Sequence, residues 1–125
     1  MKNYELRNVK LPIQIKNKND FDKITLSSMD DISIVDYLDK LKIKVYDVKI
    51  NRSKQMPYIK LNIVGSNKNL QEFLSTMNKE FNLVNTDDIM KIFDFFEKNG
   101  MKIYRTPTAS DIARKRWGVL AGYWN

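Results

Sequence analysis

The chain has 125 residues, and 22 lysine and arginine residues against 15 aspartate and glutamate residues give it a formal net charge of +7. This length fits one domain, and a hydrophobic content of 42% is ordinary for a globular protein. The absence of cysteine and histidine excludes disulfides, thiolate metal sites, cysteine nucleophiles and histidine bases. We expect a single α+β domain over residues 1–125 that is soluble and cytoplasmic, without a signal peptide or a membrane span.

The first half of the chain predicts a strand, a helix and a hairpin. Apolar and polar residues alternate over residues 6–16, which predicts a half-buried strand, and Pro12 favours an edge position. Capping residues before an apolar stripe at helical spacing predict a helix over 30–41. Two β-branched runs, 42–52 and 57–65, predict a hairpin whose five-residue connection, Ser53 to Pro57, includes the first position of the second run. The apolar parity of the first run shifts around Tyr46 and Asp47, which indicates a bulge.

The second half predicts helices and one short strand. Gly65, Ser66 and Asn67 open a helix whose apolar stripe runs to Phe81. Another helix starts at Thr86 and Asp87 and ends at Asn99 and Gly100, the usual left-handed cap position. Residues 101–105 read as a strand and 111–124 as a last helix. Without the extra helices, the order is β-α-β-β-α-β. We therefore predict a ferredoxin-like (split β-α-β) sheet with an inserted helix and an extra C-terminal helix, the latter an appendage over 106–125.

The strand positions that do not face the predicted core are rich in lysine, tyrosine and amide side chains. Lysine neutralises phosphate, tyrosine stacks on unpaired bases, and amides reach base edges, so this face suits single-stranded nucleic acid. Two other interpretations remain open: an ordinary solvated face, since lysine on strands also guards against aggregation, and a face covered by the last helix. The residues of this face are Lys10, Gln14, Lys16, Lys42, Lys44, Tyr46, Tyr58, Lys60, Asn62, Lys102 and Tyr104.

The C-terminal stretch holds a second candidate site. As a helix, it places Trp117 and Trp124 on one apolar stripe, with Arg114 and Lys115 elsewhere. Large aromatic residues at helical spacing usually pack into a core, which is one interpretation. The other is that a basic and aromatic group anchors a nucleic acid or an acidic protein, because tryptophan, tyrosine and arginine dominate interface hot spots. This group is Arg114, Lys115, Arg116, Trp117 and Tyr123.

One part of this region resembles a known DNA-binding family. Residues 92–100, then Thr106 to Ala113 with its Asp-Ile-Ala triplet, and then Trp117-Gly118-Val119, resemble the first two helices of a winged helix-turn-helix domain. The resemblance implies DNA binding. The step from Ala113 to Gly118 is one residue longer than the family's, and seven residues after Gly118 are too few for a recognition helix, so it assigns no base-reading residue.

The acidic residues offer little for catalysis. The pairs Asp30-Asp31 and Asp87-Asp88 stand at predicted helix starts, where capping and the helix dipole favour carboxylates without any metal. Asp47-Val48-Lys49 matches the acidic-x-lysine half of a nuclease motif, but no Pro-Asp partner precedes it. We expect no enzyme, no cofactor and no metal.

Abundant Lys, Asn and Ile with little Arg (17, 13, 13 and 5 residues) favour codons of an AT-rich bacterial or phage genome. We expect a small basic accessory or regulatory protein that binds single- or double-stranded nucleic acid. The alternative is a protein-interaction module, such as a phage-encoded inhibitor of a host nuclease or defence complex, or a virion component. For either partner, a nucleic acid or a nucleic-acid-handling protein, the predicted site is Lys42, Lys44, Tyr46, Tyr58, Lys60, Lys102, Tyr104, Arg114, Lys115, Arg116 and Trp117.

Overall fold

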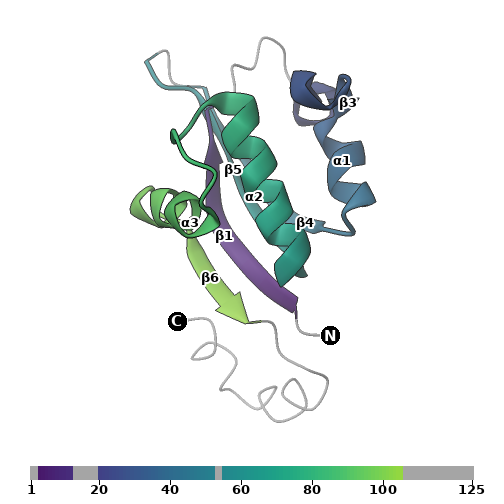
Figure 1. Cartoon of the computed structure of the whole chain (residues 1–125). Coiled ribbons are helices and arrows are strands. Elements are labelled where there is room, and N and C mark those ends of the chain that lie inside the picture. The colour runs from purple at the N-terminus through teal and green to yellow at the C-terminus, as the bar shows by residue number, and fades with distance from the viewer. Residues whose placement is uncertain (1–2, 13–19, 53–54, 106–125) are drawn as a thin grey trace.

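The computed structural model describes residues 3–12, 20–52 and 55–105, which form a mixed α+β arrangement (Figure 1). A four-stranded antiparallel sheet has the order β4-β5-β1-β6, and β2 and β3 form a separate two-stranded ribbon. The sheet strands are β1 (Asn3–Leu11), β4 (Lys44–Asn51), β5 (Tyr58–Ser66) and β6 (Lys102–Arg105), and the ribbon strands are β2 (Thr25–Leu26) and β3 (Ile32–Ser33). The helices are α1 (Ile34–Lys40), α2 (Asn67–Phe81) and α3 (Ile89–Lys98), with short 3-10 turns η1 (Asp20–Lys23) and η2 (Ser27–Met29).

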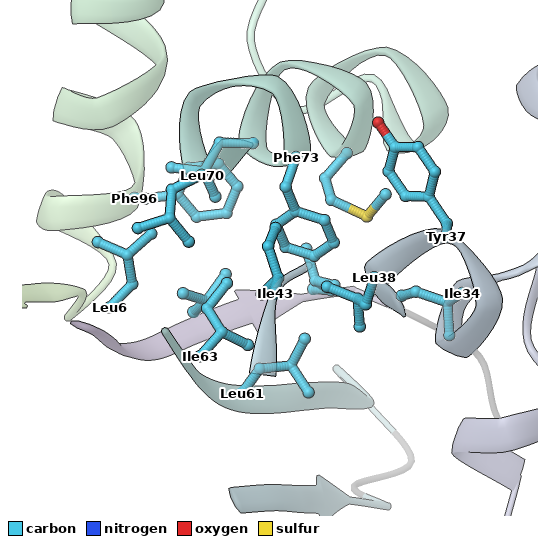
Figure 2. Close-up of a cluster of buried hydrophobic side chains, with 14 of the residues drawn as sticks. Leu6, Ile34, Tyr37, Leu38, Ile43, Leu61, Ile63, Leu70, Phe73 and Phe96 are labelled. Carbon is cyan, nitrogen blue, oxygen red and sulfur yellow. The ribbon is translucent and has the colours of Figure 1, made fainter. Parts of the chain in front are cut away.

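The three helices lie on one side of the sheet and enclose the hydrophobic core with it (Figures 1 and 2). Leu61 and Ile63 point from β5 toward Phe73 of α2, and all three side chains are fully buried. The α1 helix closes one flank through Tyr37, whose hydroxyl bonds the Thr76 hydroxyl at 2.8 Å. Burial raises the pKa of Tyr37, which keeps this hydroxyl neutral. One face of the sheet is therefore committed to packing, and the other carries no helix of the described chain.

Side-chain caps set the starts of the helices. Ser66 accepts a bond from the Asn69 N–H and begins α2, as predicted. The predicted start of the first helix is wrong, because Asp30 and Asp31 adopt left-handed backbone angles, which an α-helix does not accommodate. Ser33 caps α1 instead, and the helix begins at Ile34.

The first strand differs from its prediction at both ends. It begins at Asn3, ends at Leu11, and lies between β5 and β6, so the predicted edge position is wrong. Pro12 follows the strand and leaves its hydrogen bonding intact. A bulge between Leu6 and Val9, with Asn8 at φ 62°, keeps both apolar side chains in the core although three positions separate them.

The hairpin prediction is confirmed, with β4 and β5 paired antiparallel. Its bulge is confirmed as well, because the register shifts between Val45 and Asp47 and leaves Tyr46 as the additional residue. After the bulge Val48 and Ile50 return to the core side, opposite Leu61 and Ile59.

The segment from α2 to β6 is organised by polar contacts. The buried Asn78 amide accepts the Val84 N–H at 2.7 Å and donates to the Thr86 carbonyl at 3.0 Å, which fixes the loop after α2. Asp88 caps α3 by accepting from the Met90 N–H. The helix ends before Gly100, whose φ of 101° confirms the predicted left-handed cap. The predicted helix over 111–124 lies outside the described residues.

A charged contact ties the insert before α1 to the helix layer. Both Glu80 carboxylate oxygens accept bonds from η2: one from the backbone and hydroxyl of Ser27, the other from those of Ser28, at 2.6 to 3.1 Å. Burial opposes ionisation of Glu80, but these four bonds outweigh it and hold the pKa of Glu80 below its ordinary value. The carboxylate is thus fully engaged on the helix side.

Candidate functional site

Three lysines form one row across the sheet, on the face away from the helices. Lys49 of β4 lies opposite Lys60 of β5, and Lys60 lies opposite Lys10 of β1. Directly opposite side chains on neighbouring strands have their Cβ atoms about 5 Å apart, and like charges in this position destabilise a sheet. Among the residues that the structure describes, no carboxylate forms an ion pair with any of the three. The lysine row is therefore a concentration of positive charge without an ion-paired carboxylate among the described residues, although Asp47 lies two residues before Lys49 on the same face.

Aromatic and amide side chains border the lysine row. The Lys10 ammonium lies 5.2 Å from the centre of the Tyr58 ring, a cation-π contact that orients the ring beside the row. Tyr58 is opposite Asn51, and Asn62 is opposite Asp47 at the β4 bulge. Flat rings and amides next to a cationic row are the groups that hold bases and phosphates of a single strand.

The other end of this face has a different character. Glu5 is only 9% exposed, and it lies between Val64 of β5 and Tyr104 of β6. Its carboxylate forms an ion pair with Arg7, whose guanidinium carbon lies 4.9 Å from the centre of the Tyr104 ring. Glu5 and Arg7 neutralise each other at this end, but Lys44, opposite Val64, and Lys102, opposite Arg7, also lie here, so positive charge is present at both ends of the face.

The structure brings only part of the predicted set together. Tyr58 and Lys60 lie where they were predicted, at the lysine row. Lys44 lies on the same face but opposite Val64, and Lys102 and Tyr104 lie on the outer strand β6. Tyr46 is 65% exposed at the bulge.

Other members of the predicted set are not brought to this face. Lys42 precedes β4, in a turn with φ 56° where its N–H bonds the Asp39 carbonyl, so its placement on the strand face is wrong. Arg114, Lys115, Arg116 and Trp117 lie outside the described residues, as do Gln14 and Lys16.

Sequence reasoning omitted two basic residues of the face, Arg7 and Lys49. Both lie within one or two residues of a bulge, where simple alternation gives the wrong face. The signal was nevertheless present. Leu6 and Val9 are three apart, and Val48 and Ile50 have the opposite parity to Val45, so apolar spacing marks both bulges.

A hollow of about 600 Å³ adjoins the hairpin end of the lysine row. Lys10 and Tyr58 belong to its wall, together with Met56 of the β4–β5 turn and Phe95 and Asn99 of α3 or its end. Its volume falls in the range of pockets that hold small organic groups.

The structure places the acidic pairs and the acidic-x-lysine motif at helix caps, in turns and on the sheet surface. Asp88 caps α3, and Asp30 and Asp31 form the turn before β3. Asp47 and Lys49 are exposed on the same face, at and after the bulge. Within the described ranges, no three side chains of histidine, cysteine, aspartate or glutamate gather as metal ligands would.

No model of a known protein family, no curated protein and no solved structure matches this chain. None of the helices in the described ranges is long and apolar enough to cross a membrane.

Proposed function

We propose that this chain is a non-enzymatic nucleic-acid-binding protein with an accessory or regulatory role, and that the open face of its sheet binds a single strand. The observation that carries the proposal is the lysine row Lys49–Lys60–Lys10, which has no acidic partner among the described residues. A polyanion laid across the row would remove the repulsion between these lysines. Three lysines on neighbouring strands span roughly 10 Å, so they can contact consecutive phosphates of one nucleic-acid strand.

The surroundings of the row favour a single strand over a duplex. Tyr58 offers a ring beside the row and Tyr46 is exposed at the β4 bulge, and bases stack on such rings only when they are unpaired. A duplex would make the phosphate contacts, but its paired bases would not stack on the rings. We therefore expect tighter binding of single-stranded oligonucleotides than of duplexes with the same number of phosphates.

We also propose that the fold is ferredoxin-like, with α3 as the inserted helix. The strand order β4-β5-β1-β6, antiparallel throughout, is the order that a split β-α-β chain generates. The α1 helix lies between β1 and β4 in the chain, and α2 follows β5, as this arrangement requires. One face of such a sheet is covered by helices, which leaves the other for a ligand.

Fluorescence anisotropy with labelled single-stranded oligonucleotides, at several salt concentrations, tests the binding. Three lysines and one further basic contact correspond to a salt slope of about −3, or roughly a 50-fold loss of affinity between about 50 and 200 mM salt. Replacing Lys10, Lys49 and Lys60 together by glutamine should make the slope shallower by about 2. Lys68, Lys91 and Lys98 are exposed on the helices, and their replacement by glutamine is the control with the same change in net charge.

The outcomes separate the proposal from simple charge attraction. The proposal requires a much larger loss of affinity and slope for the sheet variant than for the helix variant. Equal losses would mean that net charge alone attracts the oligonucleotide, which would overturn the assigned face. If the folded wild-type protein binds no oligonucleotide at low salt, nucleic-acid binding is overturned and the protein-interaction alternative replaces it.

A further inference from the structure

The hollow beside the lysine row has a position that the sheet topology explains. The β6 strand pairs with β1 only from Tyr4 to Arg7, so in the described part of the chain β1 continues past its neighbour. The C-terminal end of α3 approaches this unpaired edge, and the Asn8 side-chain amide contacts the Gly100 carbonyl. The hollow lies between this edge, the β4–β5 turn and α3, at the end of the sheet where Figure 1 shows the hairpin and the α2–α3 loop.

The wall of the hollow combines apolar surface with amides. Leu83 and Phe95 are half-buried and packed against the core, so they are held in place, and Met56 is 77% exposed at the rim. Asn99 donates its side-chain amide to the Phe95 carbonyl at 2.8 Å, which orients the amide at the end of α3. Gln55 supplies a second amide from the turn. A flat, polar-edged ring fits such a wall, because its faces meet apolar atoms and its edge meets amides.

Lys10 of the lysine row and Tyr58, which contacts it, also form part of the wall of the hollow. A strand whose phosphates follow the row is therefore led to the mouth of the hollow. We propose that the hollow binds one unstacked base of that strand, held against Phe95 and Met56. This inference rests on the proposed function, since the row must hold the phosphates for a base to enter.

The proposal predicts a base-dependent part of the affinity, separate from the phosphate part. It is measured by comparing a single-stranded thymidine oligonucleotide with an abasic oligonucleotide of the same length and charge. Stacking of one base in the hollow contributes roughly a 5- to 150-fold difference in affinity between the two, in addition to any stacking on the tyrosine rings of the open face. Phe95→Leu keeps an apolar side chain but removes the ring, and Met56→Ala removes the rim. Both variants should bring this ratio substantially closer to one without changing the salt slope.

Matched controls exist on the same helix. Phe93 is half-buried against the core, and Met90 is 68% exposed, but neither lines the hollow. Phe93→Leu and Met90→Ala should leave the ratio at its wild-type value, and thermal melts confirm that each variant is folded. If Phe95→Leu does not fold, the comparison of the affinity ratio in Met56→Ala with that in Met90→Ala still tests the proposal.

The outcomes distinguish this inference from the proposed function. Salt-sensitive binding with equal affinity for the thymidine and abasic oligonucleotides, or a ratio unchanged in both Phe95→Leu and Met56→Ala, would overturn the base pocket while the lysine row stands. A ratio that falls equally in the pocket and control variants would also overturn it. No binding of either oligonucleotide by the folded wild-type protein would overturn the proposed function itself, and the pocket with it.

Discussion

The helix side of the molecule and the open face of the sheet differ in whether their charged side chains have partners within the fold. On the helix side, Glu80 receives four hydrogen bonds from η2, so its charge is fully engaged. On the open face, Lys60 lies opposite both Lys10 and Lys49, and none of the three forms an ion pair with a carboxylate of the described residues. Both arrangements are built from ordinary surface residues. Only the first stabilises the fold by itself.

The same four strands supply both faces of the sheet. Alternate residues of one strand therefore pack in the core or point to the open face. In β5, Leu61 is 0% exposed and packs in the core, while its neighbour Lys60 belongs to the lysine row. A residue that we expect to stabilise the fold therefore sits next to one whose charge we expect to oppose it. This contrast is a physical reason to assign the lysines to a ligand rather than to the fold.

The largest expected effect tests that division within β5. Leu61→Ala should lower the free energy of unfolding by about 2 to 5 kcal/mol, because it removes buried methyl groups and leaves a cavity. Lys60→Ala should change it by less than about 0.5 kcal/mol. Urea unfolding followed by circular dichroism measures both. A comparable loss for Lys60→Ala would show that the open face contributes to folding, which would erase the contrast.

Much of the fold was predictable because its periodic patterns are local. The apolar stripe from Leu70 to Phe81 with Ser66 before it identified α2, and Gly100 marked the end of α3. The central position of β1 was not predictable from Pro12, because the neighbours of a strand are set by distant segments. The ribbon and 3-10 turns before α1 were missed for the same reason, since Glu80 of α2 holds η2 in place.

The residue types of the candidate site were predictable from the sequence, but the particular residues that form it were predictable only in part. Alternation placed Tyr58 and Lys60 on the open face, but bulges moved Lys49 and Arg7 outside the simple pattern. Which lysines stand opposite one another depends on strand register, which a single strand's sequence does not contain. The hollow depends on where β6 stops and where α3 lies, and both are tertiary facts.

A smaller effect tests the engaged charge of the helix side. Because the pKa of Glu80 is lowered in the folded protein, its contribution is complete above the ordinary glutamate pKa and is lost as the pH falls through the folded value. Glu80→Gln should therefore cost about 1 kcal/mol near neutral pH, allowing for solvent exposure, and much less at an acidic pH below the lowered pKa of the folded protein. Urea unfolding at both pH values measures the difference.

The control for this prediction is Glu72→Gln, an exposed glutamate on the same helix for which the structure shows no comparable set of hydrogen bonds. It should change stability little at either pH. The same pH dependence of stability in Glu80→Gln and Glu72→Gln would show that the four bonds from η2 to the ionised Glu80 do not stabilise the fold. The proposed difference between the helix side and the open face would then be wrong.

The smallest expected effect has the opposite sign and concerns the lysine row itself. Lys60→Thr removes two cross-strand repulsions and should raise the free energy of unfolding by a few tenths of a kcal/mol at low salt. Lys44→Thr is the control, because Lys44 lies on the same face opposite Val64 and gains only the strand preference of threonine.

Salt then separates charge from strand preference. The advantage of Lys60→Thr over Lys44→Thr should shrink as salt rises, because screening already relieves the repulsion in the wild-type row. The same substitution should weaken oligonucleotide binding, so stability and binding would move in opposite directions at one residue, as expected where a site is kept at the expense of the fold. If Lys60→Thr is no more stable than Lys44→Thr at low salt, the row is not strained by its own charge, and the main physical reason for placing a polyanion on it disappears.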